Sequence, residues 1–354
     1  MSAAPQDPPT QPDLLCERRG RLGLATLNRP RALNALTLDM VRTLRTALDD
    51  WAADPGIDVV AIRAAGGRAF CAGGDIRRLH DLGREGRHAE ALTFWREEYA
   101  LNALISAYPK PYVALVDGLV LGGGVGVSLH GAARVAGPGY ALAMPEVGIG
   151  FFPDVGATYA LPRLPGAAGT WLALTGDRVG PGDALALGLA THAAPAEGFA
   201  AILSALESGT RVAEAVAAGG TLAAEAPLAS ARPVIDACFS ARSVADILAR
   251  LDADGSDFAA RAAKTIRGRS PTSLLVAHEQ MRRGRDLDFA EAMRTEFRIV
   301  SRIICGHDFY EGVRAAVIDK DGAPRWSPAT LEAVDPATVA AHFADLGADE
   351  LRLG

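Results

Sequence analysis

Two carboxylates near the middle of the chain lie among apolar residues, where they could transfer protons. Glu146 follows Met144-Pro145, and Asp154 follows Phe151-Phe152-Pro153. Burial beside such side chains disfavours the charged form of a carboxyl group and raises its pKa towards the neutral range that suits proton transfer. We therefore regard both residues as candidate acid–base groups. The alternatives are that Glu146 is a turn residue and that Asp154 is a helix cap.

A third carboxylate, Glu98, lies in the segment Trp95-Arg96-Glu97-Glu98-Tyr99, within a stretch that reads as helix. Carboxylates on helices commonly form exposed ion pairs with basic residues one turn away. Taken alone, Glu98 is best interpreted as half of such a surface pair.

Two glycine-rich segments, residues 66–75 and 118–126, each lead from a predicted strand into a predicted helix. The N-terminus of a helix offers unpaired N–H groups, and glycine lets a ligand approach the backbone closely. One such loop could hold a phosphate, and two converging loops could stabilise a developing oxyanion. The alternative is that these glycines only permit tight turns and close packing.

The motifs of several other enzyme classes do not occur in the chain. The third glycine of a dinucleotide-binding fingerprint would fall at Val127, and no glycine loop ends in Gly-Lys-Ser or Gly-Lys-Thr. No Gly-x-Ser-x-Gly nucleophile motif is found. The four cysteines are far apart and have no zinc-site spacing with each other or with histidines. We therefore expect no metal and no nucleotide cofactor.

The elements that must position these residues alternate between strands and helices in the first half of the chain. Short apolar runs predict strands, and apolar residues at helical spacing after Thr37 predict a helix that this threonine caps. Such alternation implies a parallel α/β layout, and helical periodicity dominates from about residue 166 onward. The predicted strands are residues 14–18 and 22–27 (a hairpin), 59–62, 112–116, 134–136 and 141–143, and a long helix is predicted over residues 88–107.

Composition excludes several broad classes of protein. The chain has 354 residues, of which 49% are hydrophobic and 22% charged, whereas a disordered chain has low hydrophobicity. No run of about 18 apolar residues predicts a membrane span. The net charge of −6 disfavours a broad electrostatic surface for nucleic acid. The first residues resemble neither a signal peptide nor a transit peptide, so we predict a cytoplasmic protein.

An ordered series of motifs between about residues 14 and 326 resembles the crotonase (enoyl-CoA hydratase/isomerase) superfamily. The motifs are Leu27-Asn28-Arg29-Pro30, Leu33-Asn34-Ala35-Leu36, Ala69-Phe70-Cys71-Ala72-Gly73-Gly74-Asp75-Ile76 and Gly122-Gly123-Gly124. Further segments are similar to the branch of the superfamily that hydrolyses 3-hydroxyisobutyryl-CoA in valine catabolism. These are Arg96-Glu97-Glu98-Tyr99, residues 144–156, Glu311-Gly312-Val313-Arg314-Ala315 and Asp319-Lys320-Asp321.

The resemblance implies a crotonase fold, a spiral of ββα repeats followed by a helical C-terminal region. We expect a flexible N-terminus over residues 1–13, a core over residues 14–230 and the helical region over residues 231–354. An apolar face around Phe297, Ile299, Val300 and Ile303-Ile304 is predicted to pack either on the core or on another subunit. A homo-oligomer is therefore left open.

The resemblance also implies a site for an acyl-CoA substrate. By position, the N–H groups of Gly74 and Gly123 would form an oxyanion hole. Ala72 and Ile76 would lie along the adenine and pantetheine of CoA, and Arg31 would meet its phosphates. Glu146 and Asp154 match catalytic acids of the hydrolases. Glu98 matches a third acid, which we assign to the hydroxyl of the acyl group.

One departure from the superfamily pattern separates the candidate reactions. Hydratases in this superfamily use a glutamate shortly after the triple glycine, and that position is Gly126 here. The expected reaction is therefore thioester hydrolysis, with Glu146 acting either as nucleophile or as general base and CoA entering as part of the substrate. Enoyl-CoA hydratase and enoyl-CoA isomerase are the alternatives, because an isomerase needs only one base. A non-catalytic protein that binds acyl-CoA is a third.

Overall fold

The computed structural model describes residues 11–353 and begins with the predicted hairpin. β1 (Leu14–Arg19) pairs antiparallel with β2 (Leu22–Leu27). The next helix, α1 (Leu38–Ala53), begins after Thr37, whose side chain accepts a hydrogen bond from the Met40 N–H. Both predictions are confirmed, because turn and cap signals act within a few residues of the chain.

The larger sheet has the strand order β1-β2-β3-β5-β7-β9, and every pair except β1–β2 is parallel. Strand β5 and much of β3 are buried, as expected for a parallel sheet covered by helices. The added strands are β3 (Val59–Ala64), β5 (Tyr112–Val116), β7 (Ala133–Ala136) and β9 (His192–Ala193).

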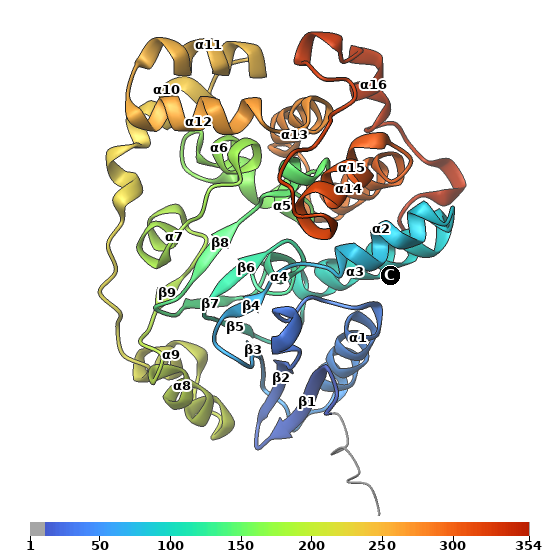
Figure 1. The fold of residues 1–354 in the computed structure, drawn as a ribbon. Helices are drawn as coiled ribbons and strands as arrows, with labels where there is room; N and C mark the ends of the chain where they lie inside the picture. Colours follow the sequence, from blue (N-terminus) through green and yellow to red (C-terminus); the bar gives the residue numbers. More distant parts are fainter. Residues whose placement is uncertain (1–10, 354) are drawn as a thin grey trace, which may run out of the picture.

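A second sheet of three short parallel strands has the order β4-β6-β8. They are β4 (Ala69–Cys71), β6 (Leu119–Leu121) and β8 (Ala141–Ala143). Each follows one strand of the larger sheet, so β3-β4, β5-β6 and β7-β8 begin three successive turns of a spiral (Figure 1). The expected crotonase architecture is therefore present.

Two expectations about the glycine-rich segments were wrong. They lead into helices as predicted, but they are not loops throughout, because they contain β4 and β6, which are too short to show an alternating pattern. The helix predicted to follow the second segment is the four-residue α4 (Gly123–Gly126), which lies inside that segment. Glycine has a low helix propensity, so only packing supports this turn.

Helices follow each repeat and continue to the end of the chain. Their order is α2 (Ile76–Arg84), α3 (His88–Ser106), η2 (Glu146–Ile149), α5 (Ala157–Ala160), α6 (Ala168–Thr175), α7 (Pro181–Leu187), α8 (Gly198–Glu207), α9 (Val212–Ala218), α10 (Arg232–Phe239), α11 (Val244–Asp254), α12 (Asp257–Arg267), α13 (Pro271–Gly284), α14 (Phe289–Ile303), α15 (His307–Val313) and α16 (Pro336–Ala341). The two-residue strand β9 interrupts the helical half of the chain, which the sequence did not predict.

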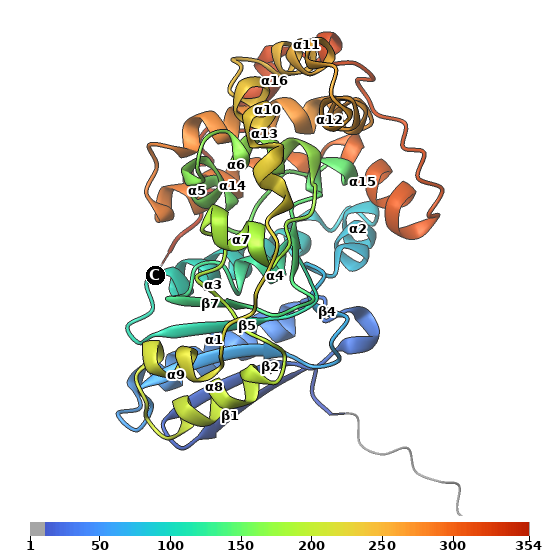
Figure 2. The same cartoon turned by 90° about the vertical axis from the view of Figure 1, so that its left-hand side faces the viewer.

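The C-terminal helices cover the core on the side opposite the larger sheet. Figures 1 and 2 show the connection after α9 running along one side of the molecule to α10. The predicted boundary at residue 230 falls in this connection and stays a prediction. None of the described helices is both long and apolar enough to span a membrane.

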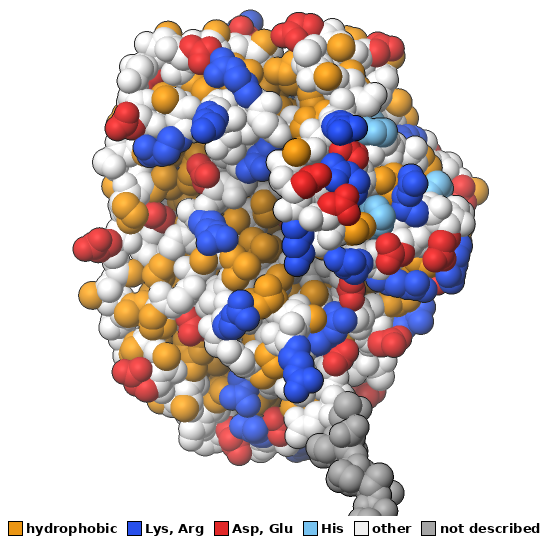
Figure 3. Space-filling view, viewed as in Figure 1, with side chains coloured by type: hydrophobic (Ala, Val, Ile, Leu, Met, Phe, Trp, Pro, Cys, Tyr) orange, Lys and Arg blue, Asp and Glu red, His pale blue; other side chains and the backbone are white. Residues whose placement is uncertain are grey.

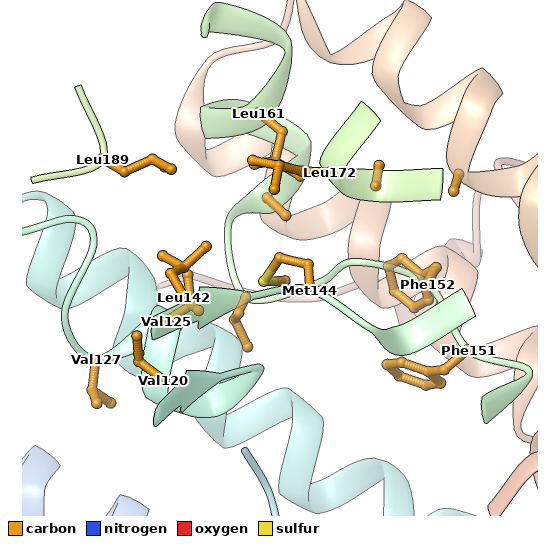
Figure 4. Packing of buried hydrophobic residues seen from close by; sticks show 14 of the residues in the cluster. Val120, Val125, Val127, Leu142, Met144, Phe151, Phe152, Leu161, Leu172 and Leu189 are labelled. Carbon is orange, nitrogen blue, oxygen red and sulfur yellow. The ribbon is translucent and has the colours of Figure 1, made fainter. Parts of the chain in front are cut away.

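One hydrophobic cluster joins the core to the C-terminal helices. Figure 4 shows Met144 near its centre, with Leu172 and Phe152 around it. The apolar face around Phe297 is also buried in this cluster, and the Phe297 ring lies against Tyr99 of α3 with a centroid separation of 6.5 Å. Of the two expectations for this face, packing on the core is therefore the one observed.

Candidate active site

A cleft of about 340 Å³ lies between the two glycine-rich segments and the loop after β8. Gly74 and Gly123 line it, and a Cβ placed on Gly123 would lie 3.4 Å from the Gly74 nitrogen. In the described chain, neither N–H donates to a carbonyl group, although the neighbouring Leu36 N–H donates to Gly73 O. The two free N–H groups are therefore close enough to act on one ligand atom.

Asn34 sets the path of the backbone beside this pair. Its side chain accepts from the Arg29 N–H at 2.8 Å and donates to Ala65 O at 2.9 Å and Ala69 O at 3.0 Å. The residue is buried and has a φ of +56°, which asparagine adopts more readily than most residues. These three hydrogen bonds and the positive φ explain why asparagine occupies the second position of the motif Leu33-Asn34-Ala35-Leu36.

Glu146 begins the 3-10 helix η2 at the opposite wall of the cleft. Its Oε1 lies 3.4 Å from the position that a Cβ of Gly122 would take, and its Oε2 has no hydrogen-bond partner in the described chain. Burial, followed by the charge of Asp154, raises the pKa of Glu146 well above its usual value. The residue therefore faces the cleft as a carboxyl group that can accept or hold a proton.

Asp154 lies on the next loop and is 4% exposed. The Tyr99 hydroxyl donates to its Oδ2 at 2.8 Å. Burial raises the pKa of Asp154 to about 7, although the bond from Tyr99 acts in the opposite direction. Such a group changes its protonation state near neutral pH, as proton transfer requires.

Glu98 is buried on α3 and is not half of a surface ion pair. It is 1% exposed, and its Oε1 has no partner in the described chain. This oxygen lies 2.5 Å from where a Cβ of Gly123 would be, so any side chain at residue 123 would displace it. Burial, with the charges of Asp154 and Glu296, raises the pKa of Glu98 well above its usual value. A buried carboxyl with a free oxygen can hold a polar group of a ligand.

The three acids share one apolar environment without a basic partner. Within the described residues, none of Glu98, Glu146 and Asp154 lies in an ion pair. Phe94, Trp95 and Phe151 complete the wall, as part of a lining that is mostly apolar. Acids that lie this close together titrate as a coupled group, so the observed pKa values describe the group and not a single residue.

Seven of the eight predicted site residues line this cleft, and the eighth does not. Those that do are Ala72, Gly74, Ile76, Glu98, Gly123, Glu146 and Asp154. Arg31 is exposed on the 3-10 helix Pro30–Ala32 and is not part of the lining. Arg269 lines the cleft, and the sequence analysis did not single it out.

The residues that hold the Asp154 loop were not predicted from the sequence. Glu296 of α14 accepts from the Gly156 N–H at 2.9 Å and the Thr158 N–H at 2.9 Å, and Gln280 of α13 donates to Pro153 O at 2.5 Å. The one available signal was that Glu296 lies on the apolar face of its helix, between Met293 and Val300. A charged residue on such a face needs partners from elsewhere in the fold.

The fold and this cleft together define a class of protein, and comparison with known families agrees. The profile of the enoyl-CoA hydratase/isomerase family matches residues 22–343. The chain belongs to this family. The predicted resemblance is therefore confirmed.

Vertebrate relatives of this chain share one name. A Danio rerio protein named 3-hydroxyisobutyryl-CoA hydrolase, mitochondrial, is 44% identical, covering 96% of this chain and 92% of its own. The Homo sapiens protein of the same name is 42% identical, covering 96% of this chain and 90% of its own.

Two solved structures are equally similar but carry other names. A protein from Mycobacterium thermoresistibile described as a carnitinyl-CoA dehydratase has a TM-score of 0.92 at 42% identity, covering 97% of this chain and 99% of its own. A Rhodobacter sphaeroides protein described as an enoyl-CoA hydratase has a TM-score of 0.91 at 43% identity, covering 96% and 100%. The names of the relatives thus divide between hydrolysis and addition or removal of water.

Proposed function

We propose that this protein hydrolyses an acyl-CoA thioester, with 3-hydroxyisobutyryl-CoA as substrate, and releases 3-hydroxyisobutyrate and CoA. The observation that carries the proposal is the meeting of two free N–H groups with three buried carboxyl groups in one cleft. The full-length similarity to proteins named as hydrolases of this thioester supports the choice of substrate.

In the proposed reaction, the thioester oxygen lies between the N–H groups of Gly74 and Gly123. Negative charge grows on this oxygen as the carbonyl carbon becomes tetrahedral, and the two donors stabilise it. Loss of one such donor in other enzymes costs about 3–4 kcal/mol, which makes this the largest single contribution we expect. The C–S bond then breaks, and the CoA sulfur leaves as thiolate and takes up a proton.

Glu146 has two chemically consistent roles in this reaction. As nucleophile, it attacks the carbonyl carbon to form a mixed anhydride, which water then cleaves. As general base, it removes a proton from a water molecule that attacks the same carbon. Its free Oε2 is compatible with both. In either role Asp154 positions the water or the substrate hydroxyl and exchanges protons with Glu146.

The space around Gly126 supports hydrolysis over hydration. A Cβ at this position would lie 2.7 Å from Asn102 Nδ2 and 2.8 Å from Val155 Cβ, both closer than real contacts allow. A glutamate could not stand here without displacing these residues. Addition of water across a double bond would therefore lack the second acid that hydratases use, although an isomerase with Glu146 as its one base stays the alternative.

Glu98 is proposed to accept the hydroxyl of the acyl group. Its unpaired Oε1 is buried, and leaving such an atom without a partner is costly. A 3-hydroxyacyl chain supplies the missing partner, whereas a plain acyl chain does not. We therefore propose a preference for 3-hydroxyisobutyryl-CoA over isobutyryl-CoA.

The CoA portion is proposed to follow Ala72 and Ile76 out of the cleft, past Arg269. This arginine donates to Thr175 O, and its Nε is buried without a partner in the described chain. Figure 3 shows basic side chains around the apolar hollow in the middle of one face, which suits a ligand with phosphates. Arg31, outside the lining, stays a predicted phosphate contact.

Three further expectations stay predictions. They are a reaction without metal or other cofactor, a possible homo-oligomer, and a cytoplasmic location. The comparisons lend no support to the last, since the vertebrate relatives are named as mitochondrial proteins.

A thiol-release assay tests the proposed function. We expect 3-hydroxyisobutyryl-CoA to release free CoA thiol, isobutyryl-CoA to release it more slowly and crotonyl-CoA to release none. Glu146→Gln is expected to lower the rate by about 10³-fold or more, because it removes the base or nucleophile. Conversion of crotonyl-CoA without thiol release would instead establish a hydratase or isomerase.

A single turnover in ¹⁸O-labelled water distinguishes the two roles of Glu146. Label in the Glu146 carboxylate establishes the mixed anhydride, because water that attacks the Glu146 carbonyl carbon leaves its oxygen on the enzyme. Label in the product acid alone is the outcome expected for a general base, and it excludes an anhydride that opens at Glu146.

A further inference from the structure

The loop that carries Asp154 has a conformation that its own residues do not favour. Val155 has a φ of +54°, in the left-handed region that β-branched residues rarely adopt. Gly156 follows with a φ of +95°, and α5 begins at once after it. Contacts from outside the loop must therefore maintain this backbone.

Those contacts come from helices α13 and α14 and from His130, and they reach backbone groups of the loop and of the first turn of α5. Gln280 of α13 donates to Pro153 O at 2.5 Å and to Thr158 Oγ1 at 2.7 Å. The His130 Nε2–H donates to Val155 O at 2.7 Å, and a carbonyl acceptor there requires the proton on Nε2.

Glu296 of α14 provides the strongest of these contacts. Its carboxylate accepts from the Gly156 N–H with both oxygens, at 3.1 and 2.9 Å, and from the Thr158 N–H at 2.9 Å. These N–H groups lie at the N-terminus of α5, where a negative charge is favourable. Glu296 is fully buried, and no basic residue in the described chain forms an ion pair with it. Burial of a carboxyl group without a basic partner costs free energy, and the hydrogen bonds from the backbone offset part of this cost.

We propose that Glu296 and Gln280 are positioning residues, which hold Asp154 in its place opposite Glu146 through the backbone of residues 153–158. The C-terminal helices then complete the active site as well as cover it. This inference rests on the proposed function only for its kinetic test, because the contacts exist whatever reaction the cleft catalyses.

Glu296→Gln is the main test, with Glu291→Gln of the same helix as the matched control. Glutamine retains an oxygen for the two N–H groups but cannot ionise. We expect kcat for 3-hydroxyisobutyryl-CoA to fall at least about tenfold with KM within about twofold, since misplacement by a fraction of an ångström slows chemistry more than binding. Glu291 pairs with Arg294 and Arg298 away from the cleft, so its variant should keep the wild-type kcat. A kcat within twofold of wild type for Glu296→Gln would overturn the proposal.

The pH profile adds a readout that simple destabilisation would not change. The titratable groups that interact with Glu296 through their charge are Asp154 of the loop and Glu98 and Tyr99 of α3. Burial and the charge of Asp154 raise the pKa of Glu296 to about 8, and above that pH its charge raises the pKa of Glu98. Glu296→Gln should therefore move the alkaline limb of kcat/KM to lower pH. An unmoved limb would contradict this.

Three further experiments keep the proposal testable if Glu296→Gln folds poorly or no thioester is hydrolysed. Gln280→Met acts on the other side of the loop and should lower kcat in the same way. In the Asp154→Asn background, adding Glu296→Gln should lower the residual rate less than twofold, because both act through one residue. Hydrogen exchange of the amide groups of residues 154–158 requires no turnover. Exchange should be faster in Glu296→Gln but not in Glu291→Gln. Unchanged exchange in Glu296→Gln would contradict the proposed positioning role, even in an inactive enzyme.

Discussion

Asp154 is buried in the cleft, and this burial lowers the stability of the folded protein at alkaline pH. Burial raises its pKa from 3.8 to about 7, so the folded state binds this proton more tightly than the unfolded state does. The stabilising contribution of the group is complete below about pH 3.8 and is lost as the pH rises through about 7. At alkaline pH, the folded protein must therefore hold a buried charge.

Asp154→Asn should remove this penalty. We expect its melting temperature at pH 8 to exceed that of wild type by about 2 °C or more, while the difference shrinks at pH 5, where wild-type Asp154 is protonated. Differential scanning fluorimetry at the two pH values measures this. Asp49→Asn, at an exposed position of α1, should show no such dependence. An equal difference at both pH values would mean that Asp154 is not buried as a protonated acid.

At the scale of elements, the loop that carries Gly74 depends on a neighbouring segment that does not line the cleft. Leu36 pairs with Gly74 in an isolated parallel bridge, with Leu36 N–H donating to Gly73 O and Asp75 N–H to Leu36 O. Asn34, two residues earlier, attaches this segment to Ala65, which precedes β4, and to Ala69, the first residue of β4. A single polar side chain thus connects the segment after the hairpin to the strand that precedes Gly74.

Asn34→Ala should weaken both the fold and the reaction. It removes three hydrogen bonds and places alanine at a φ of +56°, so we expect a loss of about 2–4 kcal/mol in the free energy of unfolding together with a lower kcat. Urea unfolding and the thiol-release assay measure the two effects. Asn34→Gly accepts the same backbone angle, so it should be less destabilised. If the two variants unfold at the same urea concentration, the backbone conformation contributes nothing.

At the scale of the whole molecule, the last residues fasten the C-terminal helices to α3. Arg298 of α14 contacts Glu291 at 2.7 Å and Glu350 at 2.7 Å, and its side chain is only 16% exposed. Arg96 of α3 donates to the backbone oxygens of Asp349 and Glu350. Residues 349 and 350 therefore lie against the helix that carries Glu98, and Figures 1 and 2 show this part of the chain beside α3.

Arg298→Met should test how much this fastening contributes. Because Arg298 is mostly buried between two carboxylates, we expect a loss of about 1–3 kcal/mol in the free energy of unfolding. Arg45→Met is the control, since the Arg45–Asp49 pair is exposed on α1 and should contribute less than about 1 kcal/mol. Equal losses in the two variants, measured by urea unfolding, would show that burial of Arg298 has no special effect.

Much of the first half of the fold was predictable because its signals are local. The cap at Thr37, the turn between β1 and β2, and the apolar strands β3 and β5 are each specified by a few adjacent residues. The three-residue strands β4 and β6 were not, because so few residues show no periodicity. The buried state of Glu98 was missed for a similar reason, since its neighbours Arg96 and Glu97 are polar.

The sequence by itself determined the family, the order of the elements and the acids Glu146 and Asp154, because motif order and apolar surroundings are properties of adjacent residues. Only the tertiary structure decided which groups meet. Glu296 accepts a hydrogen bond from the N–H of Gly156, which lies 140 residues earlier in the chain. Tyr99 donates a hydrogen bond to Asp154, which lies 55 residues later. No pattern within a segment encodes such pairs, because each is created when separately specified elements bury their apolar faces against one another.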